Sequence, residues 1–179
     1  TAGTVTAPAP SARTNDFFGT AFALDGDTLA VGASEPVSAS GDAISTTSGA
    51  AYVFTRQANG WTAAPIELRA SNGDPDDEFG RSIAVRGDVL AVGAFREDGL
   101  VAGTEGAGDT ANAGTDVGAV YVFRKAGNGW NQVRYVKPPV ARDNAALGTS
   151  VVLTPFGMLA GASADGAAPT FSGLVHEYN

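Results

Sequence analysis

The chain of 179 residues has no cysteine and a single histidine, His176. Without cysteine there are no disulfides, thiolate metal sites or thiol nucleophiles. A lone histidine with no recognisable nucleophile motif does not indicate a catalytic triad, so the sequence favours a protein that is not an enzyme. No apolar run approaches the ~18–20 residues of a membrane span, which argues against membrane insertion.

Positive charge is also scarce, because 11 Lys and Arg residues stand against 19 Asp and Glu and give a net charge of −8. Nucleic acids and anionic membranes bind through basic patches, so neither is an expected partner. The acidity suits a soluble extracellular protein, or one that uses cations. Glycine is abundant, with 24 residues, and this indicates many turns between short strands.

One pattern occurs three times along the chain. Its copies are Phe18-Gly19 with Leu29–Ala33, Phe79-Gly80 with Leu90–Ala94, and the weaker Leu147-Gly148 with Met158–Ala162. The repeating unit is about 60–70 residues long, which is typical of a repeat built from one supersecondary motif.

Each repeat holds short apolar runs separated by turn signals. In the first copy the runs are 20–24, 28–33, 50–54 and 61–68, and Asp25-Gly26 and Asn59-Gly60 mark tight hairpins. Four antiparallel strands per repeat are typical of a propeller blade. No segment shows sustained helical periodicity, so the predicted fold is an all-β propeller.

The predicted boundaries leave the third blade incomplete. A single domain, 1–179, divides into an outer strand at about 3–8 and repeats at about 16–70, 77–137 and 145–179, the last without a fourth strand. Three blades are too few to close a ring. Either the chain is a fragment of a larger propeller, or its N-terminal strand completes the third blade of another copy and builds a ring or a filament.

These residues resemble the FG-GAP repeat of integrin α-subunit heads, in particular its bacterial secreted versions. The resemblance is carried by Phe18-Gly19 and Phe79-Gly80, by Val31–Ala33 and Val92–Ala94, and by Gly49–Phe54 and Gly118–Phe123. It implies a secreted or cell-surface module that binds protein partners in adhesion. The third copy departs from the pattern at Leu147, Thr154 and His176. The integrin calcium loop does not fit here, since the hairpin at Asp25–Asp27 is too short to supply six oxygens.

Candidate binding residues fall on loops expected at one end of the blades. Asp74, Asp76, Asp77 and Glu78 are carboxylates of the kind that Ca²⁺ prefers, and the alternative is a solvated loop in which Asp77 caps a turn. Glu97, Asp98, Glu105 and Asp109 lie in the longest loop and are predicted to face a ligand.

Two alternatives concern other ligands. A lectin would bind glycans between blades, with Trp61 and Trp130 as stacking platforms, although their identical offsets from Phe54 and Phe123 favour packing. Arg86-Gly87-Asp88 spells the tripeptide that integrins recognise, but Asp25–Asp27 occupies the same hairpin, so the turn alone explains it.

Overall fold

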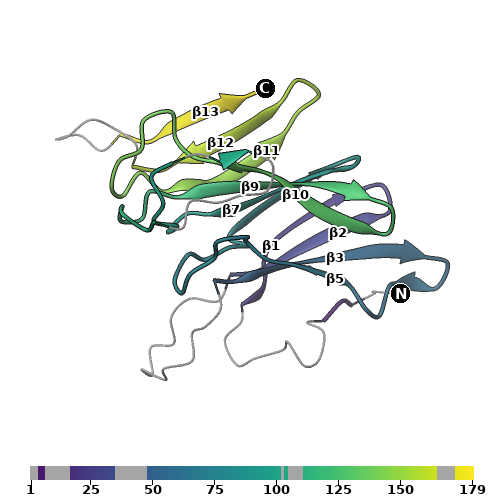
Figure 1. Ribbon diagram of the computed structural model, residues 1–179. Coiled ribbons are helices and arrows are strands. Elements are labelled where there is room, and N and C mark those ends of the chain that lie inside the picture. Colours follow the sequence, from purple (N-terminus) through teal and green to yellow (C-terminus); the bar gives the residue numbers. More distant parts are fainter. Residues whose placement is uncertain (1–3, 7–16, 35–47, 102, 105–110, 165–171) are drawn as a thin grey trace.

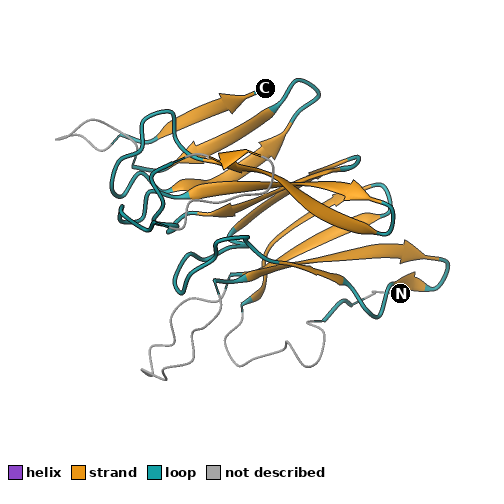
Figure 2. Ribbon diagram, in the orientation of Figure 1, coloured by secondary structure: helices purple, strands orange, loops and turns teal. Residues whose placement is uncertain are grey.

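The computed structural model describes residues 4–6, 17–34, 48–101, 103–104, 111–164 and 172–179. These residues form three antiparallel sheets, and no helix occurs among them (Figure 2). The predicted all-β class is therefore confirmed. In these ranges no helix is long and apolar enough to cross a membrane.

Sheet 1 comes from the first repeat. It contains β1 (Phe18–Asp25), β2 (Thr28–Ala33), β3 (Ala50–Gln57), β4 (Gly60–Trp61) and β5 (Ile66–Leu68). Both β4 and β5 pair with β3, so the predicted fourth strand is split into two short pieces. Pro65 immediately precedes β5, and a proline has no N–H to donate to a strand partner.

Sheet 2 comes from the second repeat and is the most complete. It contains β6 (Ser82–Arg86), β7 (Val89–Ala94), β9 (Ala119–Ala126), β10 (Gly129–Val136) and β8 (Gly103–Thr104). The order is β6-β7-β9-β10-β8. The short β8 comes from the long loop after β7 and pairs with the outer edge of β10, which the sequence did not predict.

Sheet 3 has three strands in the order β11 (Leu147–Leu153), β12 (Met158–Ala162) and β13 (Leu174–Tyr178), as predicted. Of the predicted outer strand at 3–8, the structure describes residues 4–6, and these form no strand. Val5 instead packs against the aromatic cluster of sheet 1.

The hairpins β1–β2 and β6–β7 are here called the inner hairpins. The sequence pattern predicts glycine as the second residue of each two-residue loop, but the structure places it first. Asp25 pairs with Thr28 and Arg86 with Val89, so the loop residues are Gly26-Asp27 and Gly87-Asp88. Both glycines have a φ of 54°. A two-residue turn with glycine at its first position needs this left-handed backbone, which residues with a Cβ rarely adopt.

The three sheets lie one behind the other like the blades of a fan, and β1, β6 and β11 run along the same side of the stack (Figure 1). The face of each sheet that points to the next repeat is here called its forward face, and the opposite one its backward face. Sheets 1 and 2 meet at junction 1, and sheets 2 and 3 at junction 2. A buried apolar cluster fills each junction. The described strands do not close into a ring.

Both junctions repeat the same close approach of main chains. A Cβ built at Gly32 of sheet 1 would overlap the carbonyl oxygen of Gly80, and one at Gly93 of sheet 2 would overlap that of Gly148. The glycine of Val-Gly-Ala therefore lets the glycine of Phe-Gly in the next repeat reach the sheet surface. This contact explains why both glycines recur in the repeat.

Candidate functional site

The loops that follow the second and the outermost strands of the sheets gather at one end of the stack, opposite the inner hairpins (Figure 1). Several hydrogen bonds join them. Asn112 Nδ2 donates to Asp74 Oδ2 at 2.7 Å, the Thr115 N–H to Asp143 Oδ1 at 3.0 Å, and the Arg96 N–H to the Asp77 carbonyl at 3.4 Å. The described parts of these loops therefore form one connected surface, here called the loop end.

A buried polar network underlies the loop end. The carboxylate of Glu97 accepts hydrogen bonds from Asn72 Nδ2 at 3.0 Å and from the Tyr135 hydroxyl at 2.7 Å, and it forms an ion pair with Lys137 Nζ. The Tyr121 hydroxyl donates to Asn72 Oδ1 at 2.8 Å. The side chains of Glu97 and Lys137 are each only 1% exposed. Such a pair is stable only when its partners satisfy it, as they do here.

Burial favours the neutral forms of two side chains at the loop end, Tyr121 and Asp77. Burial raises the pKa of Tyr121, so its hydroxyl stays a proton donor. Burial also raises the pKa of Asp77 from 3.8 to about 7, and the nearby negative charges of Glu97 and Asp74 act in the same direction. The Asp74 N–H donates to Asp77 Oδ2 at 2.8 Å and partly offsets these effects.

The four predicted calcium ligands are not gathered around one point. Asp77 is buried, and Asp74 binds Asn112. Glu78 lies 3.8 Å from the Arg96 guanidinium, whose positive charge opposes a cation. Asp76 has one buried carboxylate oxygen without a hydrogen-bond partner, but in the described ranges no three acidic, histidine or cysteine side chains are placed to share a metal.

Of the predicted ligand-facing residues, Glu97 lies below the surface. Its carboxylate is enclosed by the buried network, so its position suits holding the loop rather than meeting a ligand. Asp98 lies in the same loop, and its Oδ1 accepts a hydrogen bond from the Asp116 N–H at 2.7 Å. Glu105 and Asp109 lie outside the described residues.

The two tryptophans are engaged in packing. Trp130 is buried in the cluster of junction 1. One face of the Trp61 ring is covered by the Arg56 guanidinium, 4.4 Å from the ring centre. A cation in this place takes the position that a stacked sugar would need.

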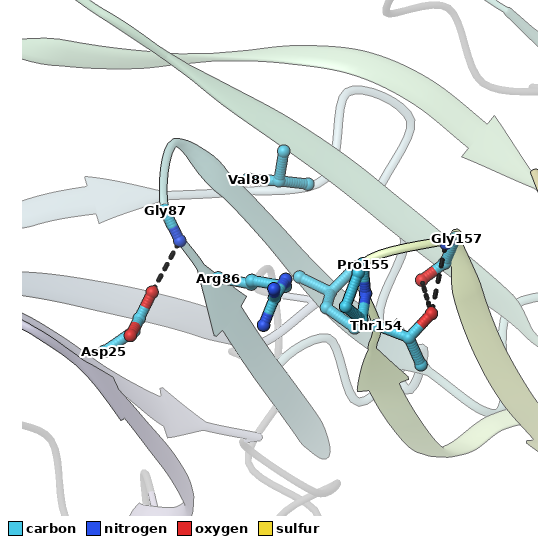
Figure 3. Close-up of a pocket in the computed structure, with 8 residues that line it drawn as sticks. Asp25, Arg86, Gly87, Val89, Thr154, Pro155 and Gly157 are labelled. Atoms are coloured by element: carbon cyan, nitrogen blue, oxygen red, sulfur yellow. Dashed lines mark hydrogen bonds between the residues drawn. The ribbon is translucent and has the colours of Figure 1, made fainter.

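A pocket of about 640 Å³ lies among the inner hairpins, at the other end of the stack (Figure 3). Asp25 of sheet 1 and Arg86 of sheet 2 line it together with Pro155 of sheet 3. The Gly87 N–H donates to Asp25 Oδ2 at 2.6 Å. The turn of Arg86-Gly87-Asp88 is therefore held by a contact between two sheets, which accounts for its shape without an outside ligand.

The forward face of sheet 3 and the β1 part of the backward face of sheet 1 are exposed, whereas Tyr52 and Phe54 on the same backward face are buried. A comparison of equivalent positions shows the exposed parts. Phe22 on the backward face of sheet 1 is 73% exposed, whereas Ile83 at the same place in sheet 2 is 8% exposed. Val175 on the forward face of sheet 3 is 70% exposed, whereas its counterpart Val120 is fully buried. Within the described chain, no further sheet covers these two apolar faces or pairs with the outer edge of β13.

Repeated antiparallel sheets with the same contact at each junction define a β-repeat protein of the propeller type. The FG-GAP repeat pattern matches residues 6–54 and 66–123, which is more than half of the chain. The chain therefore belongs to the FG-GAP repeat family. A comparison with curated proteins gives no match.

Proposed function

We propose that the chain is an extracellular, non-enzymatic binding module that acts in adhesion through protein–protein contacts. FG-GAP repeats usually mediate binding of this kind and typically belong to extracellular or surface-exposed proteins. The composition supports the same conclusion, since the chain has no cysteine and only one histidine for catalysis.

The observation that carries the proposal is the open side of sheet 3. Val175 of its edge strand β13 is exposed on the forward face, and so is Val152 of β11, two strands away on the same face. An apolar sheet face with an available edge binds partners by strand addition, in which main-chain hydrogen bonds give affinity and side-chain pockets give specificity. The partner adds a fourth strand to the third blade.

The test uses a strand that fills the same position elsewhere in the molecule. In sheet 1, β5 pairs with β3 through Ile66 opposite Val53 and Glu67 opposite Tyr52. A synthetic peptide with the sequence of residues 64–70 is titrated into the ¹⁵N-labelled chain and followed by NMR. We expect saturable shifts of the amides of β13, and a peptide carrying Glu67→Pro serves as the control because it lacks the central N–H. Unchanged β13 amides at saturating peptide would contradict strand addition.

A further inference from the structure

We propose that the partner of the open faces is a second copy of this chain, docked head to tail. The backward face of sheet 1 in one copy covers the forward face of sheet 3 in the next, and the segment around Val5 becomes the fourth strand of sheet 3. This inference rests on the proposed function and names its partner. The two junctions within the chain supply the geometry of the contact.

Each internal junction brings a glycine of one sheet against a glycine of the next, and both kinds of glycine are also present at the outermost faces. Gly161 of sheet 3 occupies the position of Gly32 and Gly93, and Gly19 of sheet 1 occupies that of Gly80 and Gly148. A Cβ built at Gly19 meets no atom within 4 Å, whereas one at Gly80 or Gly148 meets the main chain of the preceding sheet. Gly19 therefore presents a main chain that no preceding sheet covers.

Main-chain and side-chain donors at the junctions have counterparts as well. The Phe79 N–H donates to the Ser48 carbonyl at 2.6 Å, and the Leu147 N–H donates to the Val117 carbonyl at 3.1 Å. The positions equivalent to these two pairs are Phe18 of one copy and Ser172 of the next. Across junction 2 the Ser82 hydroxyl donates to the Gly148 carbonyl at 2.7 Å. Ser150 is the counterpart of Ser82 and would donate to the incoming Gly19 carbonyl.

The apolar side chains of the two open faces match those that fill the junctions. On the backward face, Phe22 and Leu24 stand where sheet 2 has Ile83 and Val85, which pack in junction 1. On the forward face, Val152 stands where sheet 2 has Ala84, which packs in junction 2. Docking buries large apolar groups that are exposed in the single chain, and this is favourable by about 25 cal/mol per Å² of apolar area.

The N-terminal segment is already on the required side of sheet 1. Val5 packs against the cluster that contains Tyr52 and Phe54 of sheet 1. Ile66 likewise packs against the cluster that contains the equivalent aromatic residues of sheet 2. Ile66 belongs to the fourth strand of the preceding sheet and pairs with Val53. By the same register, Val5 of one copy pairs with Glu177 of the next, and Thr6 pairs with His176.

Glu177 on the forward face of sheet 3 has a charged side chain, whereas the equivalent residues in the two junctions are apolar. It replaces Val53 and Val122, and it places a negative charge on the edge strand. Charged residues on edge strands limit uncontrolled association. We therefore expect Glu177 to weaken the head-to-tail contact, so that Glu177→Val strengthens it.

The contact joins two different surfaces, so copies add in one direction and form a ring if the rotation closes or a filament if it does not. The test uses one variant for each face: Phe22→Glu for the backward face and Val175→Glu for the forward face. Both side chains are exposed, so neither change disturbs the core. Masses are measured by sedimentation velocity across a concentration series, with Val140→Glu, an exposed site in the loop after β10, as the control.

We expect the unmodified chain and the Val140→Glu variant to associate with rising concentration. Each face variant alone stays monomeric, and an equimolar mixture of the two forms a one-to-one dimer and nothing larger, because one intact copy of each face remains. Glu177→Val should tighten association at least about tenfold, which corresponds to about 1.4 kcal/mol. A monomeric unmodified chain together with a monomeric Glu177→Val variant overturns the inference.

A mixture that fails to dimerise, or a single face variant that still associates, also overturns it. Neither result removes the proposed function, which is judged by peptide binding at β13. Binding of the peptide without self-association would show that sheet 3 accepts a strand from a different protein. Loss of both would end the two proposals together.

Discussion

Sheet 2 and its two neighbours are built from the same repeat, yet they differ in what surrounds them. Sheet 2 has a sheet on both faces and a buried polar network. Sheets 1 and 3 each have a sheet on one face only, and Phe22 and Val175 are exposed where their counterparts in sheet 2 are buried. At these two positions burial is therefore decided by the neighbouring repeat rather than by residue type, as in other repeat proteins.

A basic residue follows the outer strand in both sheet 1 and sheet 2, Arg69 after β5 and Lys137 after β10. The two residues differ in burial. Lys137 after β10 is buried against Glu97, whereas Arg69 after β5 forms a half-exposed pair with Glu67 at 2.7 Å. The two residues hold equivalent places in their repeats. Within the described residues, the cation of sheet 2 is enclosed because the loop after β7 supplies Glu97, and the cation of sheet 1 is not.

The largest expected effect comes from breaking the enclosed pair. Lys137→Met leaves Glu97 charged and buried, and we expect the free energy of unfolding to fall by about 3–5 kcal/mol. The matched change Arg69→Met should cost less, about 1–2 kcal/mol, because it removes an exposed ion pair and one hydrogen bond to the Gly49 carbonyl. Urea denaturation followed by tryptophan fluorescence measures both values. Similar losses for the two variants would remove the distinction between sheet 2 and sheet 1.

A pair of glycine substitutions compares a junction with an open face directly. A Cβ at either Gly93 or Gly161 meets a serine hydroxyl of its own sheet, but only the one at Gly93 also meets the carbonyl of the next sheet. We expect Gly93→Ala to destabilise by about 1–3 kcal/mol and Gly161→Ala by clearly less. Thermal unfolding is measured at a concentration where the chain is monomeric. Equal losses would mean that the junction does not set the cost.

The smallest expected effect is a pH dependence that comes from Asp77. Its pKa in the folded chain is about 7 against an ordinary value of 3.8, so between these values the folded state binds the proton more tightly than the unfolded state. Stability contributed by this group is complete below about pH 4 and falls as the pH rises toward 7. Burial raises the pKa of Glu78 and Asp98 in the same direction.

Asp77→Asn removes the titration, while its amide oxygen keeps an acceptor for the Asp74 N–H. We expect the variant to lose less stability than the unmodified chain between pH 4 and 8, by on the order of 1–3 kcal/mol. Denaturant midpoints across that range measure the difference. Identical pH profiles would show that the carboxyl is not held in its neutral form.

Much of the fold follows from the sequence, because the repeat constrains it three times. The apolar runs predict β2 and β7 with the bounds that the structure shows, and they predict the three strands of sheet 3. The errors were local. Pro65 divides the outer strand of sheet 1, and the hairpin glycine stands at the first loop position because the turn needs its left-handed backbone there.

The candidate site was harder to predict, because its key contacts join residues that are distant in sequence. Glu97 and Lys137 are 40 positions apart. Because acidic loop residues are usually solvated, the sequence predicts that Glu97 faces a ligand. The signal that the sequence did offer was the alignment of Lys137 with Arg69, together with the repeated core tyrosine at Tyr121. The buried carboxyl of Asp77 had no such signal, since its neighbours Asp76 and Glu78 are half-buried at most.

The glycine contact between sheets has a consequence for how such a chain could lengthen. Each repeat carries both partner glycines of the contact, at Gly32, Gly93 and Gly161 on the forward faces and at Gly19, Gly80 and Gly148 on the backward faces. A tandem duplication of one repeat therefore inherits a working interface on each side and needs no new complementary surface. Repeat number can change in single genetic steps, and the two signature glycines are the residues that such steps must leave intact.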